Sequence, residues 1–328
     1  MKLQMECLPR SWQLREAFTT SRGTQLSADG VLLTLKDAMG RQGRGEAYGI
    51  PYEGETPASI VAELERARAE IESGVSRAEV QSLLPHGGAR CALDLALWDL
   101  EAKVSGVPAW QRAGITALRP ITTAFTIGMR SLKATAARAG ELSELPLLKI
   151  KVGSDEPLEF IRAVHAAAPR SRLIVDPNQS WSLQLLKGLA PELEALNVVL
   201  LEQPLPVDGD AGLEDWDSPI PICADELVHD LLDLPLAIGR YEVVNVKLDK
   251  AGGLTEGLAL ARSALNSGLR VMVGCMAGSS LAMAPAAIVA QLCDFVDLDG
   301  PLLQSDDWPN PIHYSKGSMT FPLAALWG

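Results

Sequence analysis

Short β-rich runs alternate with helical stretches from about residue 116 onward, and this alternation constrains the fold more than any other feature. Eight runs fit strands: 121–128, 146–152, 172–176, 198–203, 221–226, 242–248, 270–274 and 295–299. The residues at their ends recur evenly, with 25 positions from Lys151 to Asp176 and then 26, 23, 22 and 27 more to Gly274. Near-continuous apolar strands spaced by one helix each are typical of a parallel sheet. Eight such βα units close a barrel.

The first 115 residues follow another pattern. Leu32–Leu35 and the segment around Glu46–Gly49 predict a small antiparallel sheet, and Thr56-Pro57 opens an amphipathic helix that runs to about Ser73. A helix from about Gly88 to Ser105 is apolar almost all round, which predicts burial where two domains meet. Within it, Asp99 and Lys103 have the i, i+4 spacing of a side-chain pair.

These patterns predict an α/β fold in two parts. We expect residues 1–115 to form an α+β capping domain and residues 116–310 to form the barrel. About residues 311–328 should return to the cap and complete it, because WPNP favours a loop and MTFPLAAL is typical of a short apolar return. A regular helix after the eighth strand is not expected in so short a tail.

The charge balance disfavours two classes of partner. Acidic side chains outnumber basic ones by 41 to 29, a net charge of -12, so nonspecific binding to nucleic acid or anionic membranes is not expected. Residues 271–293 carry no charge, but glycines and Pro285 interrupt them, which fits a strand, a loop and a buried helix better than a membrane span. The N-terminus lacks the apolar core of a signal peptide, which predicts a cytoplasmic protein. The five scattered cysteines read as reduced core thiols.

Three acidic residues end three successive predicted strands: Asp176, Glu202 and Asp225. At the carboxyl-terminal rim of a barrel they would converge, repel each other and raise each other's pKa unless a cation lay between them. An all-oxygen ligand set suits a hard divalent ion, and Mg²⁺ is the predicted cofactor.

Lysines flank these carboxylates along the chain. Lys149 and Lys151 alternate with Ile150, so both point to the same face of their strand, and Lys247 lies on the strand after Asp225. A lysine beside other cations has a lowered pKa and can serve as a general base. Any one of them could be a lysine that reaches out to solvent from a barrel end, but that interpretation does not account for the set.

Other motifs are weak. Gly252-Gly253 or Gly278-Ser279-Ser280 could bind phosphate in a barrel, although glycine-rich pieces alone carry little weight. The four histidines have neither metal nor triad spacing, and no nucleophile elbow is present, so a hydrolase is a poor fit.

The ordered motifs resemble the muconate-lactonizing subgroup of the enolase superfamily over nearly the whole chain. They are ARCALDLALWDLEAK (89–103), KIK (149–151), IVDPNQ (174–179), LLEQP (200–204), ICADE (222–226) and KLDKAGG (247–253). The resemblance implies a (β/α)7β modified TIM barrel with a capping domain, and Mg²⁺ held by Asp176, Glu202 and Asp225. It also implies proton abstraction next to a carboxylate, with the metal stabilising the enediolate.

Residue roles follow from the same resemblance. Lys151 and Lys247 would be opposed acid/bases, Lys149 would stay cationic and bind the substrate carboxylate, and Asn178, Glu226 and Asp249 would orient ligands and lysines.

Two further elements look like those of dipeptide epimerases. Asp297-Leu298-Asp299 resembles the DxD element that binds a substrate α-ammonium, and Arg22 in FTTSRGTQ (18–25), the position of a mobile cap loop, would meet a glutamate side-chain carboxylate. The implied reaction is epimerisation of an L-Ala-D/L-Glu-like dipeptide in cell-wall peptide metabolism. Ala277 departs from relatives that often carry an acid there.

Alternatives stay open at this point. The same core would suit a cycloisomerase or an o-succinylbenzoate-synthase-like lyase, and a noncatalytic barrel that binds a small ligand is the rival from another class. The sequence leaves open the second residue of the dipeptide and the oligomeric state, a homo-oligomer included.

Overall fold

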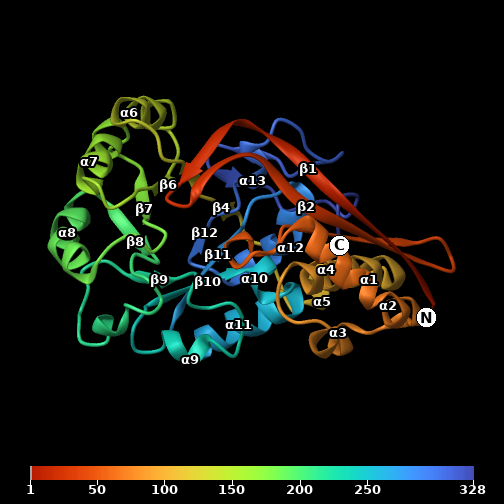
Figure 1. The fold of residues 1–328 in the computed structure, drawn as a ribbon. Coiled ribbons are helices and arrows are strands. Elements are labelled where there is room, and N and C mark those ends of the chain that lie inside the picture. Colours follow the sequence, from red (N-terminus) through yellow and green to blue (C-terminus); the bar gives the residue numbers. More distant parts are fainter. Residues whose placement is uncertain (1) are drawn as a thin grey trace.

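Eight parallel strands form the centre of the protein in a computed structural model that describes residues 2–328 (Figure 1). In chain order they are β5 (Phe125–Ile127), β6 (Leu147–Lys151), β7 (Arg172–Asp176), β8 (Val198–Glu202), β9 (Ile222–Ala224), β10 (Val243–Lys247), β11 (Arg270–Gly274) and β12 (Phe295–Val296). Each strand pairs with the next in sequence. The Ala124 N–H donates to the Val296 carbonyl at 2.8 Å and joins the last strand to the first. The predicted barrel is confirmed.

Helices cover the outside of the barrel. The long ones are α6 (Leu132–Glu141), α7 (Pro157–Ala167), α8 (Leu183–Ala195), α11 (Leu254–Asn266) and α12 (Ser280–Val289). Short turns complete the connections: η2 (Ala211–Leu213), α9 (Leu234–Ala237), α10 (Leu248–Ala251), η3 (Ala290–Leu292) and α13 (Gly300–Leu303). The eighth helix is thus a single turn, as expected. After β8 the predicted helix is only η2, because prolines at 204, 206, 219 and 221 break the segment.

The barrel interior is layered. Each of the eight strands contributes one residue to an inner apolar cluster, with Ala124 lying just before β5. The residues are Ala124, Leu147, Ile174, Leu200, Cys223, Val243, Met272 and Phe295. Because strand side chains alternate, the residue two positions further along each strand also faces inward. Those residues are Thr126, Lys149, Asp176, Glu202, Asp225, Asn245, Gly274 and Asp297, all of them buried. A polar layer therefore lies directly on an apolar one.

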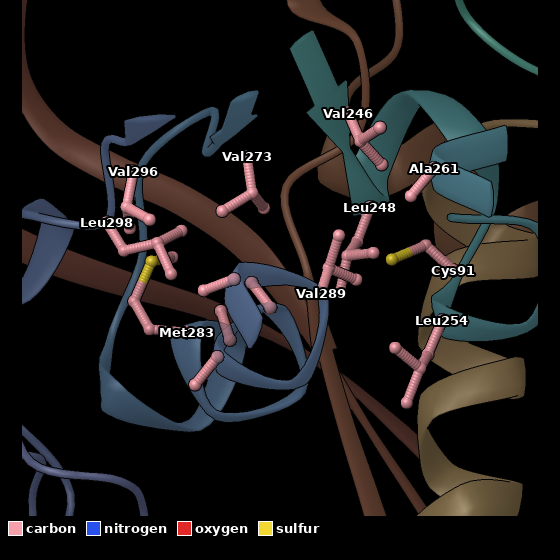
Figure 2. Packing of buried hydrophobic residues seen from close by; sticks show 14 of the residues in the cluster. Cys91, Val246, Leu248, Leu254, Ala261, Val273, Met283, Val289, Val296 and Leu298 are labelled. Atoms are coloured by element: carbon pink, nitrogen blue, oxygen red, sulfur yellow. The ribbon is translucent and has the colours of Figure 1, made fainter. Parts of the chain in front are cut away.

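The outward residues of the same strands pack against the helices. Val246, Val273 and Val296 belong to a second cluster with Met283 of α12, and Figure 2 shows Cys91 of the cap directed toward Leu248. Residues 271–293 accordingly form β11, a loop and the buried α12, as predicted. No helix in the described residues is long and apolar enough to span a bilayer.

The N-terminal part holds an antiparallel sheet and five helices. Its strands are β1 (Leu3–Thr20), β2 (Gly23–Asp37) and β3 (Gln42–Ala47); its helices are α1 (Pro57–Arg66), α2 (Arg68–Gly74), α3 (Arg77–Leu83), α4 (Gly88–Ser105) and α5 (Ala109–Arg112), with a short η1 (Pro51–Glu53). The helix predicted to reach Ser73 is broken at Ala67, so α1 and α2 are separate.

Several predicted strands are shorter than expected, with β9 reduced to Ile222–Ala224, and contacts elsewhere in the chain explain two of the changes. The run 121–128 is split: β4 (Ile121–Thr122) pairs with β14 (Ser318–Met319), itself paired with β13 (Tyr314–Ser315), and only β5 joins the barrel. The eighth barrel strand ends at Val296, because the Leu298 N–H turns to the Thr123 hydroxyl.

The C-terminal segment packs on the cap (Figure 1). The Gly328 N–H donates to Asp99 at 2.8 Å, and the Trp327 indole donates to the Arg44 carbonyl at 2.9 Å. Asp99 also pairs with Lys103 at 2.7 Å, which confirms that predicted contact. The division into residues 1–115 and 116–310 stays a prediction.

Two glycines allow β3 to lie directly on α4. A Cβ built on Gly43 would lie 2.1 Å from the Ala96 carbonyl oxygen, and one built on Gly45 would lie 2.0 Å from that of Ala92. Both carbonyls belong to helix backbone, which cannot move aside cheaply. This close approach presses the cap sheet against α4.

We expect Gly45→Ala to destabilise the protein by about 1–3 kcal/mol or more, because overpacking forces backbone shifts. Gly140→Ala is the matched control. It lies in α6 with open space around it, and alanine there should stabilise by about 0.5–1 kcal/mol. Urea unfolding of both variants measures the difference, and equal stabilities would contradict the packing argument.

Candidate active site

The topology sets two lysines on opposite sides of the barrel mouth. Lys151 ends β6 and Lys247 ends β10, four strands apart in a ring of eight. The arc between them carries Asp176, Glu202 and Asp225 at the ends of β7 and β8 and just after β9. The other arc carries Asp297, beyond β12. The structure therefore brings together the predicted carboxylates and lysines.

Lys149 lies at the centre of this arrangement. Its ammonium is 2.7 Å from Glu202, 2.8 Å from Asp297 and 3.1 Å from Asp176, and its side chain is 3% exposed. Burial alone would lower its pKa, but the three negative charges, that of Asp297 foremost, hold the pKa well above its usual value. These contacts favour the charged form of Lys149, in which it is a cation fixed among three carboxylates.

The two candidate bases each contact one carboxylate. Lys151 donates to Asp176 Oδ2 at 2.5 Å and to Asn178 Oδ1 at 3.0 Å. Lys247 donates to Asp225 Oδ2 at 2.5 Å and lies 4.0 Å from Glu202. Although burial by itself lowers the pKa of Lys247, the charge of Asp225 raises it above its usual value. With an ionised Asp225 beside it, the ammonium form of Lys247 is therefore stabilised.

The three carboxylates differ in their electrostatics. Burial raises the pKa of Asp176 and Asp225, but nearby lysines reverse this: Lys151 and Lys149 lower the pKa of Asp176, and Lys247 and Lys250 hold that of Asp225 well below its usual range. Burial raises the pKa of Glu202 to about 7, and the charge of Asp176 adds to the shift. Glu202 is thus the least well compensated of the three.

The carboxylate oxygens of Asp176, Glu202 and Asp225 suit a hard cation chemically, but they are not arranged around a common point in this structure. Among residues 2–328, no three acidic, histidine or cysteine side chains stand in the arrangement of a metal site. All three carboxylates are ion-paired to lysines instead. Glu202 Oε2 is buried and lies 2.7 Å from the Lys149 ammonium, but it forms no hydrogen bond with any residue of 2–328. Its chemistry suits a Mg²⁺ ligand, because a buried oxygen of this kind still has room for a further electropositive partner.

Asp297 and Asp299 lie together at one end of the mouth. Asp297 accepts from Lys149 and, at 3.3 Å, from the Thr126 hydroxyl, while Asp299 accepts from the Thr126 N–H at 2.6 Å. Burial raises the pKa of Asp299 to about 7, followed by the charge of Asp297. The pair forms an anionic end to the site.

Arg22 lies at the opposite end, on a hairpin. The predicted mobile loop 18–25 is the tip of β1 and β2, where Phe18 pairs with Gln25 and Thr19 with Thr24, because β-branched threonines favour strand pairing. The Arg22 guanidinium ion-pairs with Glu226, and Glu226 also accepts from Asn178 Nδ2 at 3.2 Å. Arg22, Glu226 and Asn178 are therefore linked to Lys151.

Asp249 has a different place from the one expected. Its Oδ1 accepts from the backbone N–H groups of Tyr48 at 2.5 Å and Gly49 at 2.9 Å, so it fastens the cap to the barrel. Burial raises its pKa to about 7. Nothing in its contacts orients a ligand or a lysine, because its side chain is turned to the end of β3.

Sequence reasoning missed three residues that contact the predicted site residues. Lys250 donates to Asp225 Oδ1 and to the Val228 carbonyl, both at 2.8 Å, and is fully buried. Asn245 donates to Glu202 Oε1 at 2.9 Å, and Thr126 holds both aspartates of the anionic end. The inward alternation of β10 could have revealed Asn245, since it lies two positions before Lys247.

Two adjoining hollows make one cleft over these groups. The first is lined by Thr126, Asp297, Asp299, Gly300 and Ala277, and the second by Arg22, Tyr52, Asn178 and Thr24. Lys151, Lys247, Phe18, Gln25, Cys275 and Met276 line both. The cleft therefore runs from an anionic end, between two opposed lysines, to a cationic end.

Comparison with known families identifies the class. A model described as enolase C-terminal domain-like matches residues 131–325, and one for the N-terminal domain of mandelate racemase and muconate lactonizing enzyme matches residues 2–114. The chain therefore belongs to the enolase superfamily, in its mandelate racemase and muconate lactonizing branch.

Relatives narrow the class to racemases and epimerases. The chain is 39% identical to an L-Ala-D/L-Glu epimerase of Escherichia coli K12 over 311 residues, covering 94% of this chain and 97% of the relative. It is 44% identical to an N-acetyl-D-glutamate racemase of a Pseudoalteromonas species over 250 residues, covering 76% and 79%.

Solved structures agree in fold. One is an enolase family member from Agrobacterium tumefaciens with homology to dipeptide epimerases, solved with bound sodium and L-Ala-L-Glu. It superposes with a TM-score of 0.96 at 40% identity, covering 99% of this chain and 100% of that one. A dipeptide epimerase from Enterococcus faecalis V583 with Mg and L-Leu-L-Tyr gives 0.90 at 26% identity, covering 100% and 99%.

Lys250→Met should destabilise the protein by about 3–5 kcal/mol, because it removes one of two cations from a buried carboxylate and strands a carbonyl acceptor. The control is Lys133→Met on an exposed position of α6, expected within about 0.5 kcal/mol of the parent. Urea unfolding compares the two, and a Lys250→Met protein as stable as the control would show that the contact contributes little.

Proposed function

We propose that this protein epimerises a dipeptide whose C-terminal residue resembles glutamate, by a Mg²⁺-dependent 1,1-proton transfer at the Cα of that residue. The observation that carries the proposal is the pair of lysines on β6 and β10, on opposite sides of one cleft. Binding alone needs no opposed bases, so a noncatalytic barrel is not favoured. Cytoplasmic location and a role in cell-wall peptide metabolism stay predictions.

The metal would be held by Asp176, Glu202 and Asp225. Bound there, Mg²⁺ supplies positive charge that stabilises the enediolate formed when a proton leaves the carbon next to a carboxylate. The buried Glu202 Oε2, which forms no hydrogen bond with any residue of 2–328, supports this assignment. Lys149, a fixed cation beside the same carboxylates, adds charge for the substrate carboxylate.

The two lysines would act in turn. One, uncharged, takes the proton from Cα, and its electron pair stays on the substrate as the enediolate; the other, as an ammonium, returns a proton to the opposite face. Reversing the roles converts the product epimer back. The two lysines share the centre of the cleft, which suits a Cα placed between them.

The ends of the cleft would fix the dipeptide. A free α-ammonium suits Asp297 and Asp299, which are buried with few donors of their own. A side-chain carboxylate suits Arg22, whose guanidinium can offer paired hydrogen bonds. The predicted substrate is therefore of the L-Ala-D/L-Glu kind.

A second candidate is racemisation of N-acetylglutamate, favoured by the 44% identity with a relative of that name. N-acetylglutamate keeps both carboxylates but has no ammonium for Asp297 and Asp299. The two aspartates make the dipeptide the better fit, since an acetyl group would leave them with only the Lys149 ammonium, which Asp176 and Glu202 also contact. A cycloisomerase or o-succinylbenzoate-synthase-like lyase would likewise have no use for them.

Incubation with L-Ala-L-Glu and Mg²⁺ in D₂O should place deuterium on the glutamate Cα and produce the D epimer, as followed by NMR. Lys151→Ala and Lys247→Ala should each lower epimerisation by about 10²–10⁴-fold or more, because each removes one acid/base. Each variant should still exchange the proton of the one epimer that faces its remaining lysine.

Lys133→Ala is the control for these variants and should behave as the parent. The absence of exchange with L-Ala-L-Glu and with a panel of other dipeptides would rule the proposed reaction out. Retained epimerisation in either lysine variant would rule out the two-base assignment.

Mg²⁺ should stabilise the chelator-treated protein. A ligand present at a hundredfold over its Kd stabilises by about 2.7 kcal/mol, which a thermal unfolding series over rising Mg²⁺ detects. Glu202→Gln should lose most of that stabilisation, while Glu194→Gln on the exposed face of α8 should keep it. A Glu202→Gln protein with the parent's response would remove Glu202 from the ligand set.

A further inference from the structure

Tyr52 lines the cationic end of the cleft without an assigned role. It lies in η1, on the cap, and shares this end with Arg22, Asn178 and the two lysines. Its hydroxyl oxygen is buried, and no residue of 2–328 forms a hydrogen bond with it. Buried hydroxyl groups normally have partners, so an unpaired one that lines a binding cleft calls for a ligand.

The ring of Tyr52 also contacts Arg22. The guanidinium carbon lies 4.5 Å from the ring centroid, a cation–π geometry. Glu226 holds the same guanidinium from the barrel side. Arg22 is thus placed between an aromatic platform and a carboxylate, although it lies at the tip of a hairpin.

The segment that carries Tyr52 is firmly anchored. Glu55 accepts from the Ile50 N–H at 2.7 Å and from the Gly88 N–H at 3.0 Å, which ties both sides of η1 to the start of α4. Asp249 holds the preceding residues Tyr48 and Gly49 to the barrel. Tyr52 is therefore a rigid donor, in contrast to a hairpin-tip arginine.

The phenol keeps its proton at neutral pH. Burial raises the pKa of Tyr52 above its usual value, and the charge of Asp225 adds to this. A neutral O–H can donate a hydrogen bond to an acceptor on a ligand. Asp225 and Glu226 make these surroundings negative, so an anionic acceptor would need a neighbouring cation, and Arg22 supplies one.

We propose that Tyr52 determines specificity for an anionic side chain: its hydroxyl donates a hydrogen bond to the side-chain carboxylate of the substrate, and its ring positions Arg22 for the same group. This inference rests on the proposed function, and it identifies the residue that separates glutamate-like substrates from apolar ones.

The test compares L-Ala-L-Glu with L-Ala-L-Met, an apolar side chain of similar length. Tyr52→Phe removes only the hydroxyl. It should raise KM for L-Ala-L-Glu about tenfold, the value of one hydrogen bond to a charged group, with kcat within about twofold. Kinetic constants for L-Ala-L-Met should change by less than about twofold. Thermal stability should stay equal or rise, since the hydroxyl has no partner.

A double-mutant cycle tests whether the ring of Tyr52 positions Arg22. Tyr52→Leu removes the ring and should cost more of the L-Ala-L-Glu preference than Tyr52→Phe does. If the ring positions Arg22, then Arg22→Met should lower the preference for L-Ala-L-Glu much less in the Tyr52→Leu background than in the parent. Fully additive effects would overturn this part of the proposal.

Tyr241→Phe is the matched control. The Tyr241 hydroxyl bonds to Asp210 and Gln203 away from the cleft, so its loss should lower stability and leave the L-Ala-L-Glu to L-Ala-L-Met ratio unchanged. A Tyr52→Phe enzyme with an unchanged ratio, or with equal losses for both dipeptides, would overturn the proposal.

Failure of the proposed function gives a different result. If the parent racemises N-acetylglutamate but no dipeptide, the dipeptide assignment is wrong, and the Tyr52→Phe comparison is made with N-acetylglutamate and N-acetylmethionine. The same tenfold selective rise in KM supports the role of Tyr52, and its absence overturns it.

Discussion

Burial of opposite charges in one barrel mouth is the constraint on which the rest of this structure depends. Five carboxylates, Asp176, Glu202, Asp225, Asp297 and Asp299, face four lysines, and an isolated charge at that depth would cost several kcal/mol. Lys149 contacts three of the five, so none of them can shift without affecting another. Such a network is a poor source of net stability. Its use is geometric, because it fixes where lysine nitrogens and carboxylate oxygens lie before a substrate arrives.

The apolar layer beneath makes that network effective. Eight side chains from Ala124 to Phe295 fill the barrel and exclude water from below, and the cap covers it from above. Charges in such surroundings interact more strongly than in solvent. The cap is itself fixed through buried acids. Asp249 holds the end of β3, and Glu46 accepts from Trp12, Tyr48 and Trp308, which belong to three different segments. The cleft is therefore closed by the same kind of interaction that lines it.

Strand alternation explains what the sequence could predict. Residues near the end of a strand that share its inward face, such as Lys149 and Lys151, are recognisable from a period of two. Because parallel strands end at the same rim, the sequence also predicts that such residues from neighbouring strands lie close together. Lys250 was missed because it follows the strand on a short helix, where no period applies, and its partner Asp225 follows another strand. The contacts of Asp249 were not predictable for the same reason: nothing in KLDKAGG indicates that one acid turns to the cap while its neighbours face the barrel. The split of 121–128 depends on β14, almost 200 residues later in the chain, and no local pattern reports such a pairing.

The two ends of the cleft differ in how they are built, and this has consequences for specificity. The anionic end consists of barrel residues held by Lys149 and Thr126, so its negative charge is part of the network itself. The cationic end belongs to the cap: Arg22 lies on a hairpin and Tyr52 on a short anchored turn. Arg22 reaches the barrel network through Glu226 and Asn178, whereas the Tyr52 hydroxyl has no hydrogen bond to any residue of 2–328. Loss of that hydroxyl would therefore leave the contacts of the two lysines unchanged. Under the proposed function, the barrel would carry out the proton transfer and the cap would set the preference for the substrate side chain. An acidic chain of net charge -12 would then receive an anionic side chain through one locally placed cation.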